Sequence, residues 1–148
     1  MEVKELGHVV LYVRDMERSS RFYKDVLGWR EVARMGRWGV AFSSGRTHHE
    51  LLLIEVGKDA QPIPQGRRVG MYHFGLKVGE SDDELREALA RLTANEVPIV
   101  GMSDHTVTHS VYILDPDGNE IELYIDVQPP VWKERPEAIM APIKPLRL

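Results

Sequence analysis

The sequence predicts an α+β fold in which two tandem βαβββ modules form a curved, barrel-like mixed sheet. The main observation is an internal repeat, because GHVVLYV (7–13) and YHFGLKV (72–78) both place a histidine at the start of an apolar strand pattern. Each is followed by a charged helical stretch and then by strand-like segments. The stretch 57–70 is rich in proline and glycine and separates the halves as a linker. We therefore expect a single domain, 1–127, with modules of about 4–57 and 70–127.

A helix is predicted in each half, directly after its first strand. In the first half, the helical stripe ends before Gly28, and its apolar members are Met16, Phe22, Tyr23, Val26 and Leu27. In the second half, Leu85, Leu89 and Leu92 recur at helical spacing. Ser81 is the expected N-cap there, with Glu84 completing a capping box.

Each predicted helix is followed by strand patterns of alternating apolar residues. In the first half these are WREVARM, GVAFSSG and HHELLLIEV, and in the second half PIVGMSD, SVYILD and NEIELYID. Asp117-Gly118 provides a turn between the last two. The segment 128–148 is both proline-rich and apolar, so we expect a tail that packs on the domain or on a partner subunit.

Composition excludes several classes of function. The chain has 148 residues, no cysteine and a net charge of -4, so it lacks the basic surface that nucleic-acid binding requires and all thiolate chemistry. No run approaches the roughly 18 apolar residues of a membrane span. The first residues lack a signal-peptide pattern. We expect a cytoplasmic protein that binds neither nucleic acid nor membranes.

The internal repeat predicts a candidate metal site. His8 and His73 occupy the same place in the two halves, and Glu122 lies between apolar residues in the last strand. On a curved sheet these side chains can converge as a 2-His-1-carboxylate site with open coordination positions. A strand histidine is also compatible with a hydrogen-bonded core position, and a strand glutamate with a solvent-facing one. Residue chemistry alone leaves both interpretations open.

Further polar residues surround this candidate site. Overlaying HELLLI on IELYID places Glu50 where Glu122 stands, which would give a four-ligand site suited to nickel or zinc. Alternatively, Glu50 is an outward-facing strand residue. His48 and His49 precede Glu50 as loop or acid-base residues.

The segment from His105 to Glu122 carries the strongest signature. It resembles that of extradiol dioxygenases, with His105, Val111-Tyr112, Asp115-Pro116, Gly118 and Glu122 in their positions and a departure at Ser103. Together with RFYKDVLGW and DPDGNEIEL, the two modules resemble the vicinal oxygen chelate superfamily over about 6–126. That superfamily includes glyoxalase I, fosfomycin-resistance and bleomycin-binding proteins and extradiol dioxygenases. THHELLLIEVG and GMYHFGLKVG are similar to the small single-domain catechol 2,3-dioxygenase-like proteins.

The resemblance implies a metal-dependent extradiol dioxygenase of aromatic compound catabolism that cleaves a catechol-type aromatic diol with dioxygen. By this resemblance His8, His73 and Glu122 bind iron(II), with manganese, nickel or zinc as alternative metals. His49 is then the acid-base residue, with His48 the alternative if the register differs by one. His105 and Tyr112 hydrogen-bond the substrate oxygens. The resemblance also implies a homodimer.

Two other functions fit the same fold. A glyoxalase I-like lyase would use Glu50 as a fourth ligand around nickel or zinc, but it gives no reason for His105 and Tyr112. A non-catalytic binding or resistance protein of the bleomycin-binding type would use an apolar trough and would leave the histidines and glutamate unexplained.

Overall fold

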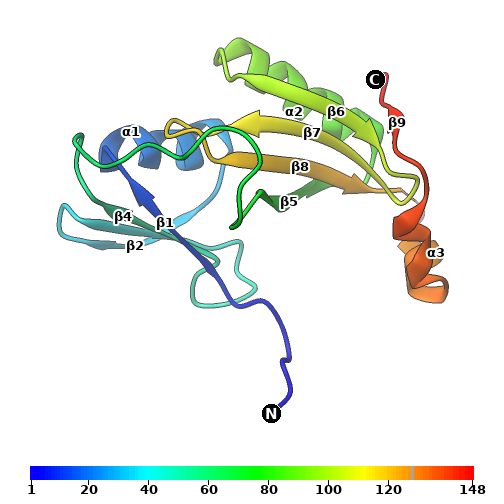
Figure 1. Ribbon diagram of the computed structural model, residues 1–148, viewed down its shortest axis with the longest axis horizontal. Helices are drawn as coiled ribbons and strands as arrows, with labels where there is room; N and C mark the ends of the chain where they lie inside the picture. The colour runs from blue at the N-terminus through cyan, green and yellow to red at the C-terminus, as the bar shows by residue number, and fades with distance from the viewer. Residues whose placement is uncertain (128) are drawn as a thin grey trace. The chain divides into compact units, whose positions relative to one another are not determined.

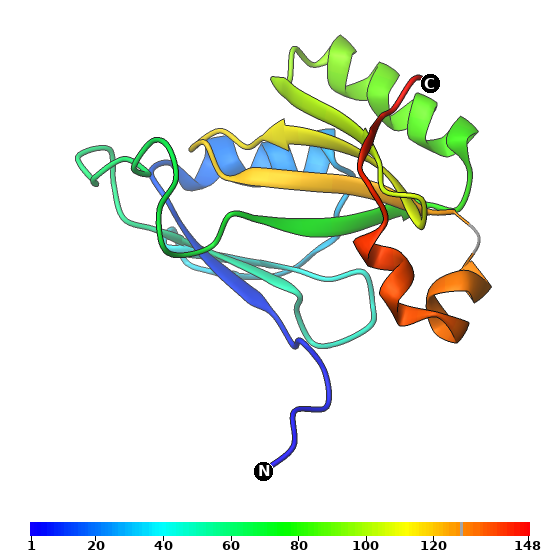
Figure 2. The same cartoon turned by 45° about the vertical axis from the view of Figure 1, so that its right-hand side comes forward.

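The computed structural model describes residues 1–127 and 129–148, and the chain divides into two compact units. Unit 1 is Met1–Pro64 and unit 2 is Gln65–Leu148. Each contains one mixed sheet and few helices, so the predicted α+β class is confirmed. Over the described residues the two sheets are separate, and neither closes into a barrel (Figures 1 and 2).

Unit 1 is a four-stranded sheet in the order β1-β4-β3-β2. Strand β1 pairs in parallel with β4, and the other neighbours are antiparallel. The helical turn η1 continues α1 as a π-helix and ends before Gly28, whose φ of 75° suits glycine. The elements are β1 (Val9–Val13), α1 (Met16–Arg21), η1 (Phe22–Val26), β2 (Glu31–Met35), β3 (Gly39–Phe42) and β4 (Leu51–Glu55).

Unit 2 repeats this plan with the order β5-β8-β7-β6, and β9 lies at the far edge. Strand β5 is parallel to β8, as β1 is to β4. The elements are β5 (His73–Gly79), α2 (Asp82–Ala94), β6 (Ile99–Asp104), β7 (Thr108–Leu114) and β8 (Glu120–Asp126). The internal repeat seen in the sequence is thus a repeat of strand order and strand direction.

The first helix of each unit, α1 or α2, begins at a side-chain N-cap. Asp15 accepts a hydrogen bond from the backbone N–H of Arg18, and Ser81 accepts one from that of Glu84. Helix α2 packs on one face of its sheet and buries Leu85 and Leu92 (Figure 2). Alternate residues of β8 are buried, as are Val111 and Ile113 of β7, and the intervening residues, including the buried Ser110, lie on the opposite face.

The C-terminal segment contains α3 (Pro129–Glu134), the 3-10 helix η2 (Pro136–Met140) and β9 (Lys144–Pro145). Strand β9 pairs with β6 through Lys144 and Asp104 and through Pro145 and Ser103. Gln128, the first residue of the predicted tail, lies outside the described residues. Throughout the described part of the chain, every helix is too short or too polar to cross a membrane.

Candidate metal and substrate site

The strand register of unit 2 places Glu122 at the centre of a polar cluster. Glu122 in β8 lies opposite Gly75 in β5 and Tyr112 in β7. A Cβ added to Gly75 would come within 3.5 Å of Glu122 Oε2 and 3.2 Å of the Tyr124 ring. Glycine at position 75 therefore lets the Glu122 carboxylate and the Tyr124 ring lie close to the β5 backbone.

The two carboxylate oxygens of Glu122 have different surroundings. Oε1 accepts hydrogen bonds from Ser110 Oγ at 2.7 Å and from Tyr112 OH at 3.2 Å. Oε2 faces His73 and lies 3.4 Å from its Nε2. The hydrogen bonds fix the carboxylate in the orientation that presents one oxygen to the imidazole.

Tyr112 connects Glu122 to His105, which lies between β6 and β7. His105 Nε2 and Tyr112 OH are hydrogen-bonded at 2.8 Å. Burial raises the pKa of the Tyr112 phenol, and the charge of Glu122 raises that pKa further. Tyr112 therefore keeps its proton at neutral pH and can donate a hydrogen bond.

His73 lies between two glutamates of the neighbouring strand. Its Nε2 faces Glu122, and its Nδ1 lies 3.5 Å from Glu120 Oε1. Nδ1 is buried and makes no hydrogen bond within the described residues. A histidine that binds a metal through one nitrogen commonly donates the other N–H to a carboxylate. Glu120 is placed to take that role after a small shift.

Unit 1 gathers the other three predicted histidines. His8 directly precedes β1, and its ring centroid lies 4.5 Å from that of His49. The His48 and His49 ring centroids are 4.4 Å apart, and their Nδ1 atoms are 2.5 Å apart. Burial lowers the pKa of His49, and the charges of His48 and His8 lower it further. His49 is thereby favoured in the neutral form that accepts a proton.

The overlay that placed Glu50 at the position of Glu122 is shifted by two residues. Val9 in β1 pairs with Leu51 in β4, as Phe74 in β5 pairs with Ile121 in β8. Because His8 and His73 precede Val9 and Phe74, the repeat matches Leu51 with Ile121. Glu50 therefore corresponds to Glu120, and Leu52 to Glu122.

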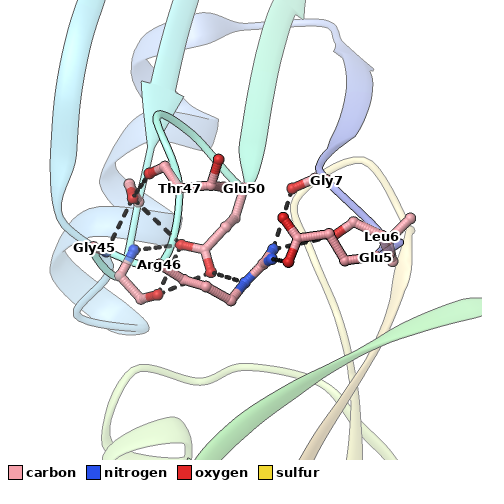
Figure 3. Close-up of polar contacts among 9 residues, drawn as sticks. Glu5, Leu6, Gly7, Gly45, Arg46, Thr47 and Glu50 are labelled. Atoms are coloured by element: carbon pink, nitrogen blue, oxygen red, sulfur yellow. Dashed lines mark hydrogen bonds and ion pairs between the residues drawn. The ribbon is translucent and has the colours of Figure 1, made fainter. Parts of the chain in front are cut away.

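The Glu50 carboxylate is already engaged within unit 1. Its oxygens accept hydrogen bonds from the Ser44 backbone N–H at 2.5 Å, from Ser44 Oγ and from Arg46 Nε at 3.1 Å (Figure 3). Burial alone would raise its pKa, but these hydrogen bonds outweigh burial and hold the pKa of Glu50 below its ordinary value. The side chain is committed to its own loop.

The residues present fit part of a divalent metal site. Nε2 of His73 and Oε2 of Glu122 are donor types that iron(II), manganese, nickel and zinc accept, and they lie 3.4 Å apart. The third predicted ligand, His8, belongs to unit 1. Over 1–127 and 129–148, no three histidine or acidic side chains are grouped closely enough to hold a metal ion.

Two residues of this cluster were not predicted from the sequence. Ser110 bonds Glu122 Oε1, and Glu120 approaches His73 Nδ1. A usable signal existed, because Ser110 and Tyr112 share one face of β7, and Glu120 and Glu122 share one face of β8. Strand alternation starting from Tyr112 and Glu122 would have found both.

Comparison with known proteins finds a matching family model and several similar proteins. Residues 5–123 match the model of the Glyoxalase/Bleomycin resistance protein/Dioxygenase superfamily. A catechol-2,3-dioxygenase of Bacillus subtilis is 34% identical over 132 residues, which cover 89% of this chain and 45% of that protein. An iron-dependent extradiol dioxygenase of Rhodococcus jostii is 32% identical over 134 residues, covering 79% of this chain and 41% of that protein. This chain thus spans less than half the length of either relative.

A solved structure shows the same fold at nearly full length. The lactoylglutathione lyase from Agrobacterium tumefaciens superposes with a TM-score of 0.63 at 30% identity. The match covers 84% of this chain and 96% of that protein. Relatives of this chain therefore include both dioxygenases and a lyase.

Proposed function

This chain belongs to the Glyoxalase/Bleomycin resistance protein/Dioxygenase superfamily, and we propose that it acts as a metal-dependent extradiol dioxygenase. The proposed substrate is a catechol-type aromatic diol, which is cleaved beside its hydroxyl groups with dioxygen. Two relatives are named as dioxygenases of this kind. The assignment rests more directly on how the side chains of unit 2 are arranged.

One observation carries the proposal, namely the hydrogen-bonded chain from His105 through Tyr112 to Glu122. His105 Nε2 lies 2.8 Å from Tyr112 OH, which lies 3.2 Å from Glu122 Oε1. This chain puts a protonated phenol directly beside a candidate metal ligand, and an imidazole beside that phenol. Such groups suit a substrate that presents two adjacent oxygens to a metal, because each oxygen needs a partner as its charge changes.

The proposed ligands are His73 and Glu122 of unit 2, with His8 of unit 1 as the third. Iron(II) bound there would supply a common site for the diol and dioxygen and would allow electrons to pass between them. Ser110 and Tyr112 hold Glu122 in one orientation through its Oε1. After a small shift, Glu120 would do the same for His73 from the side of Nδ1, which lies 3.5 Å from Glu120 Oε1.

The other residues of the proposed site donate or accept protons. Tyr112 keeps its proton because burial raises its pKa. Its hydroxyl donates to Glu122 in the free protein and would turn to donate to a substrate oxygen when the diol binds. His105 can relay a proton through the same hydroxyl. His49 is favoured as a neutral base, and its buried Nε2 makes no hydrogen bond within the described residues. This atom can take a proton in the tautomer in which His49 Nδ1–H donates to His48 Nδ1.

The lyase alternative is disfavoured by the strand register. It requires a fourth ligand from the first module, but the position that corresponds to Glu122 is the apolar Leu52. Glu50 is instead held by Ser44 and Arg46. The lyase also leaves the His105–Tyr112 pair without a task.

The proposal is tested by loading the protein with iron(II) without oxygen and then adding a panel of catechols in air. We expect the yellow ring-opened product with the native protein and none with His73→Ala. Tyr112→Phe removes one hydroxyl from the chain, and we expect turnover to fall about 100-fold with metal affinity little changed.

Thr93→Val is the matched control, because it also removes one hydroxyl, and the Thr93 hydroxyl is exposed on helix α2 and donates to the Leu89 carbonyl. It should behave as the native protein. Absence of product from every catechol, together with tight binding of nickel or zinc and isomerisation of a thiol hemiacetal, would replace the dioxygenase by the lyase.

A further inference from the structure

Arg46 lies between two segments of unit 1 that each carry a proposed functional histidine. The Nη2 atom of Arg46 donates hydrogen bonds to the backbone carbonyls of Leu6 and Gly7, at 3.2 Å each. The Nε atom of Arg46 donates to Glu50 Oε1 at 3.1 Å. Figure 3 shows the guanidinium extending from the loop before β4 to the irregular segment before β1.

The residues on either side of these contacts are the histidines. Gly7 directly precedes His8, and Glu50 directly follows His49. One guanidinium thus fixes the backbone next to His8 and the side chain next to His49. The two imidazole rings lie with centroids 4.5 Å apart.

The loop end of this bridge is itself well fixed. Glu50 accepts hydrogen bonds from Ser44, and Ser43 Oγ donates to the Thr47 carbonyl at 2.7 Å. The loop that carries His48 and His49 is therefore braced on both sides of Arg46. An arginine that joins such a loop to a neighbouring segment transmits its position to that segment.

From these contacts we propose that Arg46 is a positioning residue, which sets the distance between His8 and His49. The inference rests on the proposed function, because it gives His8 the role of metal ligand and His49 that of base. With the bridge in place, the ligand and the base are held at a fixed spacing before any metal or substrate binds.

The contacts of Arg46 do not contribute equally to its position. The Arg46–Glu5 ion pair spans 3.3 Å between side chains that are 45% and 63% exposed, so it contributes little. The Glu50 side chain is only 14% exposed, and the planar guanidinium binds it through Nε while Nη2 binds both carbonyls. Lysine offers a point charge without that planar geometry, so it should not replace arginine here.

The first test needs no metal. In the apo protein, nuclear Overhauser effects between the ring protons of His8 and His49 report their spacing. We expect Arg46→Ala and Arg46→Lys to weaken or abolish these effects while the remaining amide spectrum stays that of the folded protein. Arg34→Ala is the matched control, since Arg34 pairs with Glu17 and Glu31 in the same unit and does not contact the histidines.

The second test is iron(II) affinity, measured by competition with a chelator under anaerobic conditions. We expect Arg46→Lys to bind about tenfold more weakly than the native protein, a size typical for removing a residue that orients a ligand. Arg34→Ala should bind as the native protein does. Unchanged ring contacts in both Arg46 variants would overturn the proposal.

The two tests separate the inference from the function on which it rests. If His8→Ala left iron(II) affinity unchanged, His8 would not be a ligand and the proposed metal site would fail. Loss of the ring contacts in the Arg46 variants would then still establish the bridge. Retained contacts with weakened affinity would show that Arg46 acts by another route, and the positioning role would be wrong.

Discussion

The two units share a strand plan but differ in the side chains that the plan presents. At corresponding positions, unit 2 has Glu122 where unit 1 has Leu52, and Tyr112 where unit 1 has Ala41. Unit 2 therefore carries a hydrogen-bonded polar row, and unit 1 an apolar one. The backbone supplies equivalent positions, and the side chains decide which of them do chemistry.

The similarity is closest at the start of the parallel strands. Each unit has a histidine there, His8 or His73, and a glutamate at the matching place in the neighbouring strand, Glu50 or Glu120. Glu120 approaches its histidine directly, at 3.5 Å. Glu50 acts through Arg46 on the backbone before His8. The corresponding glutamates thus act near the histidine in both units. Glu120 faces His73 directly in unit 2, whereas Glu50 acts through Arg46 in unit 1.

The strongest test of this difference makes unit 2 resemble unit 1. Glu122→Leu removes the proposed carboxylate ligand, and we expect iron(II) affinity to fall by more than about 100-fold, beyond the usual effect of an orienting residue, with loss of turnover. Leu52→Val is the control and should bind iron as the native protein does. Native affinity in Glu122→Leu would mean that Glu122 is not a ligand.

The next test concerns the histidine pair of unit 1. His49→Ala should keep iron(II) affinity and lose about 100-fold or more in turnover, because it removes a general base. His48→Ala should have a much smaller effect on turnover, since His48 is exposed. The reverse order of the two variants would transfer the role to His48, and unchanged turnover in both would remove the pair from catalysis.

A smaller effect is expected at Glu120. Glu120→Gln keeps the shape of the side chain and removes the charge that faces His73 Nδ1, so iron(II) affinity should weaken about tenfold. Titration calorimetry with the metal measures this change. Asp83→Asn, on the exposed start of α2, is a charge-matched control that should leave affinity unchanged.

The smallest effect is on stability and depends on pH. Hydrogen bonds hold the pKa of Glu50 below its ordinary value, so the folded state favours the charged form. The stabilisation is present at neutral pH and is lost as pH falls below about 4.3, the ordinary pKa of glutamate, through the lowered pKa of the folded state. Glu50→Gln should therefore lower the free energy of unfolding by about 1 kcal/mol at pH 7. Urea unfolding at pH 7 and pH 3 should show the difference shrinking, and a constant difference would contradict it.

Much of the architecture followed from the sequence. The strands β1 to β8, helix α2 and its Ser81 cap lie where alternation, helical spacing and capping residues predicted them. The superfamily was identified from the RFYKDVLGW and DPDGNEIEL motifs and is confirmed. Part of the arrangement in unit 2 was also predicted, since Tyr112 lies beside Glu122 and His105 beside Tyr112, while their roles toward a substrate stay predictions.

The sequence did not determine whether Glu50 of the first half corresponds to Glu120 or to Glu122 of the second half. A shift by two residues keeps the same side chains on the same face of a strand, so the alternating pattern of HELLLI and IELYID is satisfied by either overlay. Only the parallel pairing of β1 with β4 and of β5 with β8 fixed Glu50 to Glu120 and Leu52 to Glu122. The sequence by itself determined the strands, their faces and the family, because these depend on local spacing. The tertiary structure decided the register and the partners of each carboxylate, because these depend on contacts between segments far apart in the chain.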